Sequence, residues 1–401
     1  MPSCTTGAPR AASRRGLPRI SDGQLLFLLH MLAHTKEPKD GGSRVAIIMN
    51  GSPLFTGDAG SGESEIRRWI LEHDLLEALI ALPEQLFYNT GIATYVWVLT
   101  NRKRAERRGK VQLIDATASW NLLRKSLGAK RREIPFEKKE DILRLLADFE
   151  DGATRKIVQD GEEREVVVSR VYPTTHFGFR KITVERPLRL DFLASPERIA
   201  RLEDERAFQN LAKSRKRGAA RAKDEEAGRE QQAAIRALLE SLPDELHLDR
   251  AAFVAELDRA AKKAKLKLPA PVRKAILSAL SERNEKAEIC RDKDGHPEPD
   301  AGLRDTESVP LPPGDDPADE EGIPQSVREF VAREVAPHVP DAWIDTNRRD
   351  PQDGKVGIVG YEINFNRYFY EYRPPRPLEA IEADIQQVEK EIVAMLREVA
   401  G

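Results

Sequence analysis

The sequence predicts an α/β fold that forms the C-terminal half of a doubly wound sheet, followed by a mainly helical region and a C-terminal coiled-coil helix. Three observations support this prediction. Helical and strand-like segments alternate over residues 22–115, as they do where helices join the strands of a parallel sheet. Residues 195–290 are rich in Ala, Lys, Arg, Glu and Leu. Apolar residues then recur at heptad spacing from residue 378 onward.

The first elements follow from apolar patterning and capping. Asp22 precedes an apolar helix over residues 24–33, with its leucines on one face. Residues 44–49 are almost continuously apolar, which is typical of a strand buried on both faces of a parallel sheet. Ser61 is the expected N-cap of a helix over residues 63–73. Further strands are expected at 76–82, 94–100 and 110–115, a helix at 138–150, and short strands around 166–168 and 177–179.

Composition divides the rest of the 401-residue chain. Between residues 297 and 322 there are nine acidic residues and one basic residue, together with six prolines, so this stretch is expected to bury too little apolar surface to fold. The predicted segments are a disordered or spurious start (1–21), a partial doubly wound domain (22–135), a mixed α/β extension (136–195), a helical region (196–290), an acidic Pro-rich linker (291–323), a compact C-terminal region (324–377) and the coiled-coil helix (378–401).

A formal net charge of only −2 hides a basic block between residues 101 and 132, which holds 11 basic and 2 acidic residues. Such a density of positive charge can neutralise several phosphates. The alternative is a solvated loop and helix face that binds nothing. The predicted DNA-binding residues are Arg102, Lys103, Arg107, Arg108, Lys110, Arg124, Lys125, Lys130, Arg131 and Arg132.

The C-terminal helix carries an uninterrupted a/d pattern with intervals of three and four residues. A surface helix of the same protein could show this stripe, but a strict seam with charged flanks favours docking onto a partner helix. The predicted partner-binding residues are Leu378, Ile381, Ile385, Val388, Ile392 and Met395.

Several classes of protein are excluded by what the sequence lacks. No apolar run reaches the roughly 18 residues of a membrane span. Cys4 and Cys290 have no ligand-spaced partners, so no metal site or disulfide framework is expected, and a cytoplasmic location is predicted. The Gly-rich stretch 57–62 is neither a P-loop nor a dinucleotide fingerprint and is interpreted as a flexible loop between a strand and a helix.

One long stretch carries a family resemblance. Residues 42–63 read GSRVAIIMNGSPLFTGDAGSGE, residues 82–92 read LPEQLFYNTGI and residues 96–101 read VWVLTN. Together they closely resemble the modification (M) subunit of type I restriction-modification systems, which are adenine-N6 DNA methyltransferases. Further matches are GLPRI at 16–20, FGFR at 177–180 with TVERPL at 183–188, GYEINFNR at 360–367 and PPRPL at 374–378.

The resemblance implies a Rossmann-like methyltransferase sheet that takes methyl from S-adenosylmethionine. In this family an Asn-Pro-Pro-Phe/Tyr motif engages the amine of a flipped-out adenine. That motif is missing, and Ser52-Pro53-Leu54-Phe55 lacks its second proline. We therefore expect the chain to begin just downstream of the catalytic loop, with no catalytic residue and no S-adenosylmethionine bound by this chain alone. Phe87 and Tyr88 are the candidates for the wall of the base pocket, the alternative being that they pack in the core.

Three hypotheses follow. The first is the C-terminal part of a type I methyltransferase subunit, inactive alone, which acts on DNA with a specificity subunit and, as a further expected partner, a restriction subunit. The second is a non-catalytic DNA-binding or subunit-assembly module derived from that family. The third is a regulatory coiled-coil protein with an incidental α/β domain.

Overall fold

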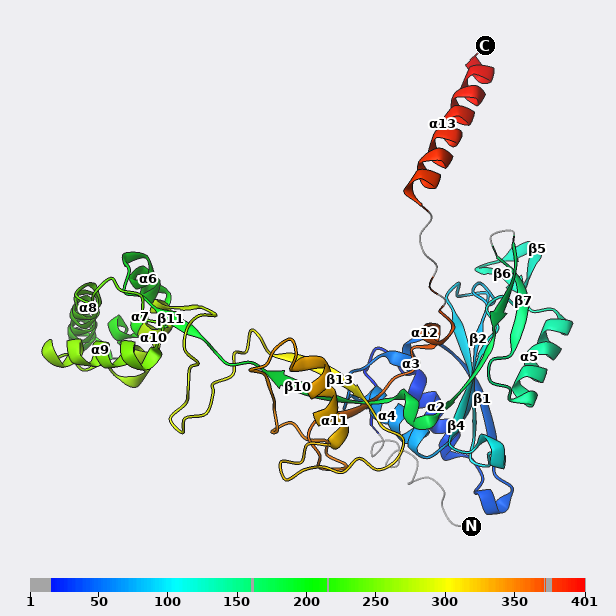
Figure 1. Cartoon of the computed structure of the whole chain (residues 1–401), viewed down its shortest axis with the longest axis horizontal. Coiled ribbons are helices and arrows are strands. Elements are labelled where there is room, and N and C mark those ends of the chain that lie inside the picture. Colours follow the sequence, from blue (N-terminus) through cyan, green and yellow to red (C-terminus); the bar gives the residue numbers. More distant parts are fainter. Residues whose placement is uncertain (1–15, 160–161, 215, 371, 373–376, 401) are drawn as a thin grey trace. The chain divides into compact units, whose positions relative to one another are not determined.

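The computed structural model (Figure 1) describes residues 16–159, 162–214, 216–370, 372 and 377–400. The chain divides into two units, one formed by residues 1–178 with 360–401 and the other by residues 179–359. Both units combine helices and strands, which confirms the mixed α/β class.

The first unit is built on a five-stranded sheet with the strand order β1-β3-β2-β4-β9. Its strands are β1 (Arg44–Asn50), β2 (Leu76–Leu82), β3 (Thr94–Thr100), β4 (Lys110–Asp115) and β9 (Ser169–Pro173). Strand β3 is antiparallel to β1 and β2, and β2 is parallel to β4. Strands β1, β2 and β4 therefore end at one edge of the sheet, called the carboxyl edge below. The opposite edge, where β3 ends and β4 begins, is called the amino edge.

Most of the predicted elements in this unit are confirmed. Helix α2 spans Gln24–Ala33, and the side chain of Asp22 accepts a hydrogen bond from the backbone amide of Gln24. Helix α4 spans Gly62–Glu72, with Ser61 as its N-cap. Strands β2, β3 and β4 have the predicted bounds. The remaining helical segments are η1 (Pro38–Asp40), α3 (Ser52–Phe55), η2 (Ala105–Arg107), α5 (Phe136–Asp148) and η3 (Thr174–Phe177).

The prediction that residues 44–49 form a strand buried on both faces of a parallel sheet was wrong. Among the strands of the described residues, β1 pairs only with β3, and this pairing is antiparallel. Only Met49 is buried in β1, while Ile48 is 48% exposed. An apolar run is also compatible with an edge strand, because the sequence alone does not show which neighbours a strand has.

Two hairpins extend this unit. The first joins β5 (Asn121–Leu127) to β6 (Lys130–Glu133), and the second joins β7 (Thr154–Gln159) to β8 (Glu162–Val167). Figure 1 shows the β5–β6 hairpin at one end of the sheet. Strand β9, which follows the second hairpin, pairs with β4. The predicted boundary at residue 135 therefore does not separate the extension from the sheet.

Residues 360–370 belong to the first unit, and a buried arginine of that unit binds to them. The guanidinium of Arg67 in α4 donates hydrogen bonds to the carbonyl oxygens of Tyr361, Pro53, Thr56 and Gly57. Burial lowers the pKa of Arg67 to about 10. Helix α12 (Phe365–Phe369) follows.

The prediction of a disordered or spurious start at residues 1–21 is corrected for residues 16–21. Residues 1–15 lie outside the described residues. The backbone amide of Arg19 donates to Glu63, and its guanidinium donates to the hydroxyl of Ser52. The carbonyl oxygen of Leu17 lies only 1.7 Å from where a Cβ on Gly62 would stand. The segment 16–21 is therefore packed against the start of α4.

The second unit contains the helical region. Its helices pack around a core in which Phe192 stacks on Phe253 at 5.1 Å, with Phe208, Leu257 and Ile276 fully buried. This agrees with the largely helical composition of residues 195–290. The elements are β11 (Leu190–Phe192), α6 (Pro196–Ala200), η4 (Arg201–Asp204), α7 (Arg206–Gln209), η5 (Asn210–Ala212), α8 (Ala219–Glu240), α9 (Arg250–Lys263), α10 (Ala270–Leu280) and β12 (Ser281–Arg283).

The same unit holds a second sheet, which corrects the prediction of a linker. Strand β13 (Asp305–Pro310), inside the acidic segment 291–323, pairs with β10 (Gly178–Glu185), and Val309 is buried. Strands β14 (Trp343–Ile344) and β15 (Ile358–Tyr361) also pair with β10, and α11 (Gln325–Phe330) and the helical turn η6 (Val331–Val335) precede them. A strand pairing thus orders residues that are too polar to form a core by themselves.

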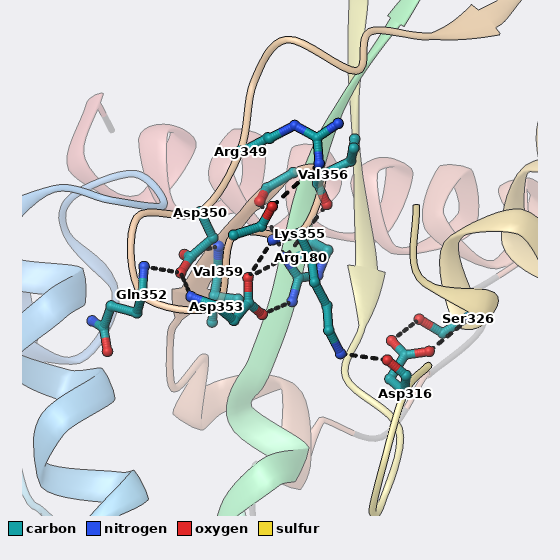
Figure 2. A network of polar contacts seen from close by, with 12 residues as sticks. Arg180, Asp316, Ser326, Arg349, Asp350, Gln352, Asp353, Lys355, Val356 and Val359 are labelled. Carbon is teal, nitrogen blue, oxygen red and sulfur yellow. Dashed lines mark hydrogen bonds and ion pairs between the residues drawn. The ribbon is translucent and has the colours of Figure 1, made fainter. Parts of the chain in front are cut away.

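A loop before β15 is fixed by a polar network (Figure 2). Arg180 of β10 pairs with Asp353 at 2.5 Å and donates to the carbonyl oxygens of Val356 and Gly357. The carboxylate of Asp350 accepts hydrogen bonds from the backbone amides of Gln352 and Asp353 in the same loop and of Val359 in β15. These contacts are within the second unit and do not include any predicted site residue.

Residues 378–400 form helix α13 (Leu378–Ala400), as predicted; residue 401 lies outside the described residues. Every predicted partner-binding side chain of this helix is at least 38% exposed. None of the described helices is long and apolar enough to cross a membrane.

Candidate nucleic-acid interface

The loop after β2 carries the two candidates for the base pocket. The backbone amide of Gln85 donates to the carbonyl oxygen of Gly91, which closes the loop. Phe87 is half-buried and packs against the core of the sheet, whereas Tyr88 is 65% exposed. The two neighbouring aromatic rings therefore have different environments, and only Tyr88 offers most of its ring to a ligand.

The β5–β6 hairpin is hydrogen-bonded to this loop. The backbone amide of Ala129 donates to the carbonyl oxygen of Tyr88 at 2.9 Å, and the amides of Arg131 and Arg132 both donate to the carbonyl oxygen of Gln85. Gly128 has a φ of 61°, and a Cβ on it would stand 2.6 Å from the carbonyl oxygen of Tyr88. A glycine here satisfies both the left-handed backbone and the close approach.

Five of the predicted DNA-binding residues lie on this hairpin. Arg124, Lys125 and Arg131 are exposed. The ammonium of Lys130 lies 5.5 Å from the ring centroid of Tyr88, within reach of a cation–π contact. The guanidinium of Arg132 stacks over the ring of Trp120 at 4.0 Å. The structure thus brings these five cations next to the candidate base pocket at the carboxyl edge.

The other five predicted residues lie elsewhere, because β4 separates the two halves of the basic block. Arg102, Lys103, Arg107, Arg108 and Lys110 precede or begin β4, at the amino edge. A six-residue strand places the two groups roughly 17 Å or more apart. The block is continuous in sequence but is not one surface patch.

Two of the amino-edge residues predicted to bind DNA are buried. The ammonium of Lys103 pairs with Asp74 at 2.5 Å and donates to the carbonyl oxygen of Lys110, and burial lowers its pKa despite Asp74. Arg107 lies 3.6 Å from the buried carboxylate of Glu77. Both cations are engaged within the protein, whereas Arg102, Arg108 and Lys110 are exposed.

A groove of about 680 Å³ lies beside the hairpin. Trp120 and Arg132 line it, together with Arg170 of β9 and residues 368–370 of the C-terminal return. The ring of Tyr368 lies 4.8 Å from that of Tyr172, which fixes this return against β9. The sequence analysis did not single out Trp120, Arg170 or these tyrosines, since they are far apart in the sequence and form no motif.

A cluster of polar side chains lies at the end of β1, at the carboxyl edge of the sheet. The side-chain amide of Gln24 donates to the side-chain oxygen of Asn50, and the hydroxyl of Ser52 donates to Asp22. Burial alone would raise the pKa of Asp22, but hydrogen bonds from Gln24 and Ser52 hold it below its usual value. Ser52 is therefore engaged in fixing the N-terminal segment, and Pro53 and Leu54 behind it are buried.

The Gly-rich loop 57–62 makes close contacts with the protein's own atoms. Its carbonyl oxygen at Gly57 accepts from Arg67, and a Cβ on Gly57 would stand 2.4 Å from the hydroxyl of Ser61. The interior of the loop is therefore filled by the protein's own atoms. Within the described part of the chain, no group of three or more His, Cys, Asp or Glu residues could hold a metal ion.

Comparison with known proteins shows which family this part of the sequence resembles. The sequence profile of the N-6 DNA methylase family matches residues 6–163, a range that includes the loop after β2 and the β5–β6 hairpin. Residues 6–163 are thus similar to this family. The resemblance to M subunits of type I restriction-modification systems is confirmed by curated relatives of the same kind.

Two of these relatives show how far the similarity extends. The type I restriction enzyme MjaVII methylase subunit of Methanocaldococcus jannaschii is 42% identical over 77 residues, which are 19% of this chain and 13% of that protein. The HindI methylase subunit of Haemophilus influenzae is 36% identical over 101 residues, which are 25% of this chain and 21% of that protein. The matched part thus spans well under two thirds of either relative.

A solved structure is also similar. The methyltransferase subunit of a type I system from Streptococcus thermophilus is 24% identical, with a TM-score of 0.31, over 40% of this chain and 29% of that one.

Proposed function

We propose that this chain forms the DNA-facing part of an adenine-N6 DNA methyltransferase subunit of the type I kind. In this proposal the β5–β6 hairpin contacts DNA phosphates, and the loop after β2 forms one wall of the pocket for the flipped adenine. Methyl transfer then requires a further polypeptide segment that brings the Asn-Pro-Pro-Phe motif. The alternative is a non-catalytic module that retains only the DNA or subunit contacts.

One observation carries the proposal, namely the hydrogen bonding of the basic hairpin to the aromatic loop. The amides of Ala129, Arg131 and Arg132 bond to the carbonyl oxygens of Tyr88 and Gln85, so cations and an exposed ring are held together at the edge where β1, β2 and β4 end. Ligands of α/β sheets bind outside the carboxyl ends of the strands. Phosphate contacts position DNA, and stacking on an aromatic ring holds an unpaired base.

The exposed side of β1 supports a role for an additional segment. An apolar strand with one unpaired edge is a template for pairing with another strand. Residues Ala46 and Ile48 are exposed on β1, and within the part of the chain that the structure describes only β3 pairs with it. We infer that further strands complete the sheet at β1 and that S-adenosylmethionine, which supplies the methyl group, is bound by the completed enzyme and not by this chain alone.

Helix α13 is proposed to bind the specificity subunit. Its seam from Leu378 to Met395 is exposed, and the e and g positions that flank the seam carry Glu382, Asp384, Glu389 and Glu391. Acidic flanks disfavour pairing with a second copy of the same helix and favour a partner helix with basic flanks. A restriction subunit would join the same complex.

Charge reversal on the two halves of the basic block tests the DNA contact. Arg124→Glu with Lys125→Glu should weaken binding of a 20-base-pair duplex roughly tenfold and reduce the slope of log affinity against log salt by about 2. The matched control is Arg102→Glu with Arg108→Glu, two exposed cations at the amino edge, which should leave both quantities nearly unchanged. An equal loss from both pairs, or from the control alone, would contradict the proposed orientation.

A labelling experiment separates the proposal from its alternative. The purified chain should transfer no labelled methyl group from S-adenosylmethionine to adenine in DNA. Transfer should appear when a polypeptide carrying the Asn-Pro-Pro-Phe segment of the family is added. Methylation by the chain alone would show that the proposed division of the active site is wrong, and no transfer by any combination would favour the non-catalytic module.

A further inference from the structure

Two arginines that line the groove beside the hairpin have N–H donors that do not all form hydrogen bonds. Its lining is aromatic and aliphatic apart from Thr117 and three charged side chains, Asp115, Arg132 and Arg170. The Nε atoms of Arg132 and Arg170 are buried and have no hydrogen-bond partner in the described part of the chain. A carboxylate oxygen of Asp115 already accepts from the amide and the hydroxyl of Thr117. A buried donor without an acceptor is unfavourable until a ligand or a rearrangement satisfies it.

The stacking of Arg132 on Trp120 orients its guanidinium. Its guanidinium carbon lies 4.0 Å from the centroid of the indole ring, and the N–H donors in the guanidinium plane can bind a planar or tetrahedral oxyanion. Arginine binds phosphate through two parallel N–H donors, which lysine cannot do. The groove therefore has the donors for a phosphate group and an indole that fixes one of them in place.

The other walls suit unpaired bases. Tyr370 lines the groove and is 71% exposed, and Trp120 lines both this groove and a second cavity of about 540 Å³ on the side of α5. Aromatic rings next to arginines are the usual platform for single-stranded nucleic acid, because every base has a face that can stack.

We propose that this groove binds a single strand of DNA, with Arg132 and Arg170 on one phosphate and the rings of Trp120 and Tyr370 against unstacked bases. This inference rests on the proposed function. Arg132 lies on the hairpin and also lines the groove, so DNA that is bound at the hairpin would lie next to the groove. The inference assigns the groove a ligand and gives Arg170 and Tyr370 roles that the sequence did not suggest.

Binding of an eight-nucleotide single-stranded DNA, followed by tryptophan fluorescence and by anisotropy of a labelled oligonucleotide, tests the inference. Arg132→Lys and Arg170→Lys keep the charge and should each weaken binding by about tenfold, because the two-donor contact is lost. Tyr370→Ala, which removes an exposed ring and leaves the core intact, should weaken it by about fivefold or more. The control is Tyr372→Ala, whose ring is 73% exposed but does not line the groove, and it should bind as the unmodified chain does.

The outcomes separate this inference from the proposed function. If the unmodified chain does not bind the octanucleotide, or if all three groove variants bind it within twofold of the unmodified chain, the inference is wrong, whether or not duplex binding depends on Arg124 and Lys125. If the groove variants lose the octanucleotide while Arg124→Glu with Lys125→Glu leaves duplex binding unchanged, the groove assignment stands and the proposed DNA contact of the hairpin is wrong.

Discussion

The backbone amide of Ala129 donates a hydrogen bond to the carbonyl oxygen of Tyr88 at 2.9 Å. This contact joins two segments that are 41 residues apart in sequence, the aromatic loop after β2 and the turn of the β5–β6 hairpin. It does not depend on any side chain, so the positions of the cations relative to Tyr88 are set by the backbone.

Gly128→Ala should weaken DNA binding by disturbing this contact. The added Cβ would stand 2.6 Å from the carbonyl oxygen of Tyr88, so the hairpin must move away from the loop. We expect a loss of duplex affinity of roughly fivefold, since about 1 kcal/mol of lost contact changes a binding constant by that factor. Anisotropy of a labelled duplex measures it.

Gly109→Ala is the matched control. Gly109 has a φ of 68°, close to the 61° of Gly128, but its added Cβ would meet nothing within 4 Å. Both variants carry the same backbone strain of about 1–2 kcal/mol, so only the clash differs. Equal duplex affinities for the two variants would show that the hairpin's position does not matter for binding.

Arg107→Ala should destabilise the fold and not act as a selective DNA-binding variant. The guanidinium lies over the ring of Phe149 at 4.2 Å and near Glu77, whose side chain is 2% exposed. Removing it leaves a buried carboxylate whose remaining ion pair in the described part of the chain is with Arg44, at a cost of about 3 kcal/mol in free energy of unfolding. Urea unfolding measures it. Arg104→Ala, an exposed neighbour, should unfold as the unmodified chain does; equal destabilisation by both variants, or none by Arg107→Ala, would contradict the buried pair.

Ionisation of Tyr368 should lower stability at alkaline pH. Burial, with a contribution from Tyr172, raises the pKa of Tyr368 to about 12 from an ordinary value of 10. The folded state thus favours the neutral phenol. Its contribution is fully present below pH 10 and is lost as pH rises from 10 to 12. Solvent screening at the partly exposed ring reduces the expected loss to about 1 kcal/mol.

Urea unfolding at pH 8 and pH 11.5 checks this prediction. The variant Tyr368→Phe cannot ionise, so its stability should fall less between these two pH values than that of the unmodified chain. An identical fall for both proteins would show that the ring is not buried against β9.

Ile385→Asp with Ile392→Asp should abolish co-purification of a co-expressed type I specificity subunit. Each substitution places a charge on the exposed seam of α13. The control is Gln387→Asp with Ala394→Asp, which has the same seven-residue spacing on another face of the helix. Retained co-purification with the seam variant, or loss with the control alone, would mean that the seam does not bind the subunit.

The sequence predicted the elements of the first unit well, because short apolar strands and capped helices leave local signals. Strands β2, β3 and β4 and helix α2 have the predicted bounds. The environment of β1 was not predictable, since a sequence of apolar residues does not show whether a strand has one neighbour or two. The same limit explains β13, whose acidic sequence forms a strand only because β10 offers a pairing edge.

The candidate site was predictable in residue type but not in arrangement. The cations at 124, 125 and 130–132 and the aromatic pair at 87 and 88 could be identified, yet nothing in the sequence indicates that a hairpin turn bonds to the loop. Burial of Lys103 depends on Asp74, which lies 29 residues earlier. A count of charged residues in the sequence does not distinguish buried cations from exposed ones. The structure shows which cations are buried.

Photochemical cross-linking tests the central claim most directly. A 20-base-pair duplex with a photoreactive base is irradiated with the full chain, and the attached peptides are identified by mass spectrometry. We predict cross-links in residues 83–91 and 121–133, the loop and the hairpin at the carboxyl edge. Cross-links confined to residues 101–110 or to the second unit would contradict the account.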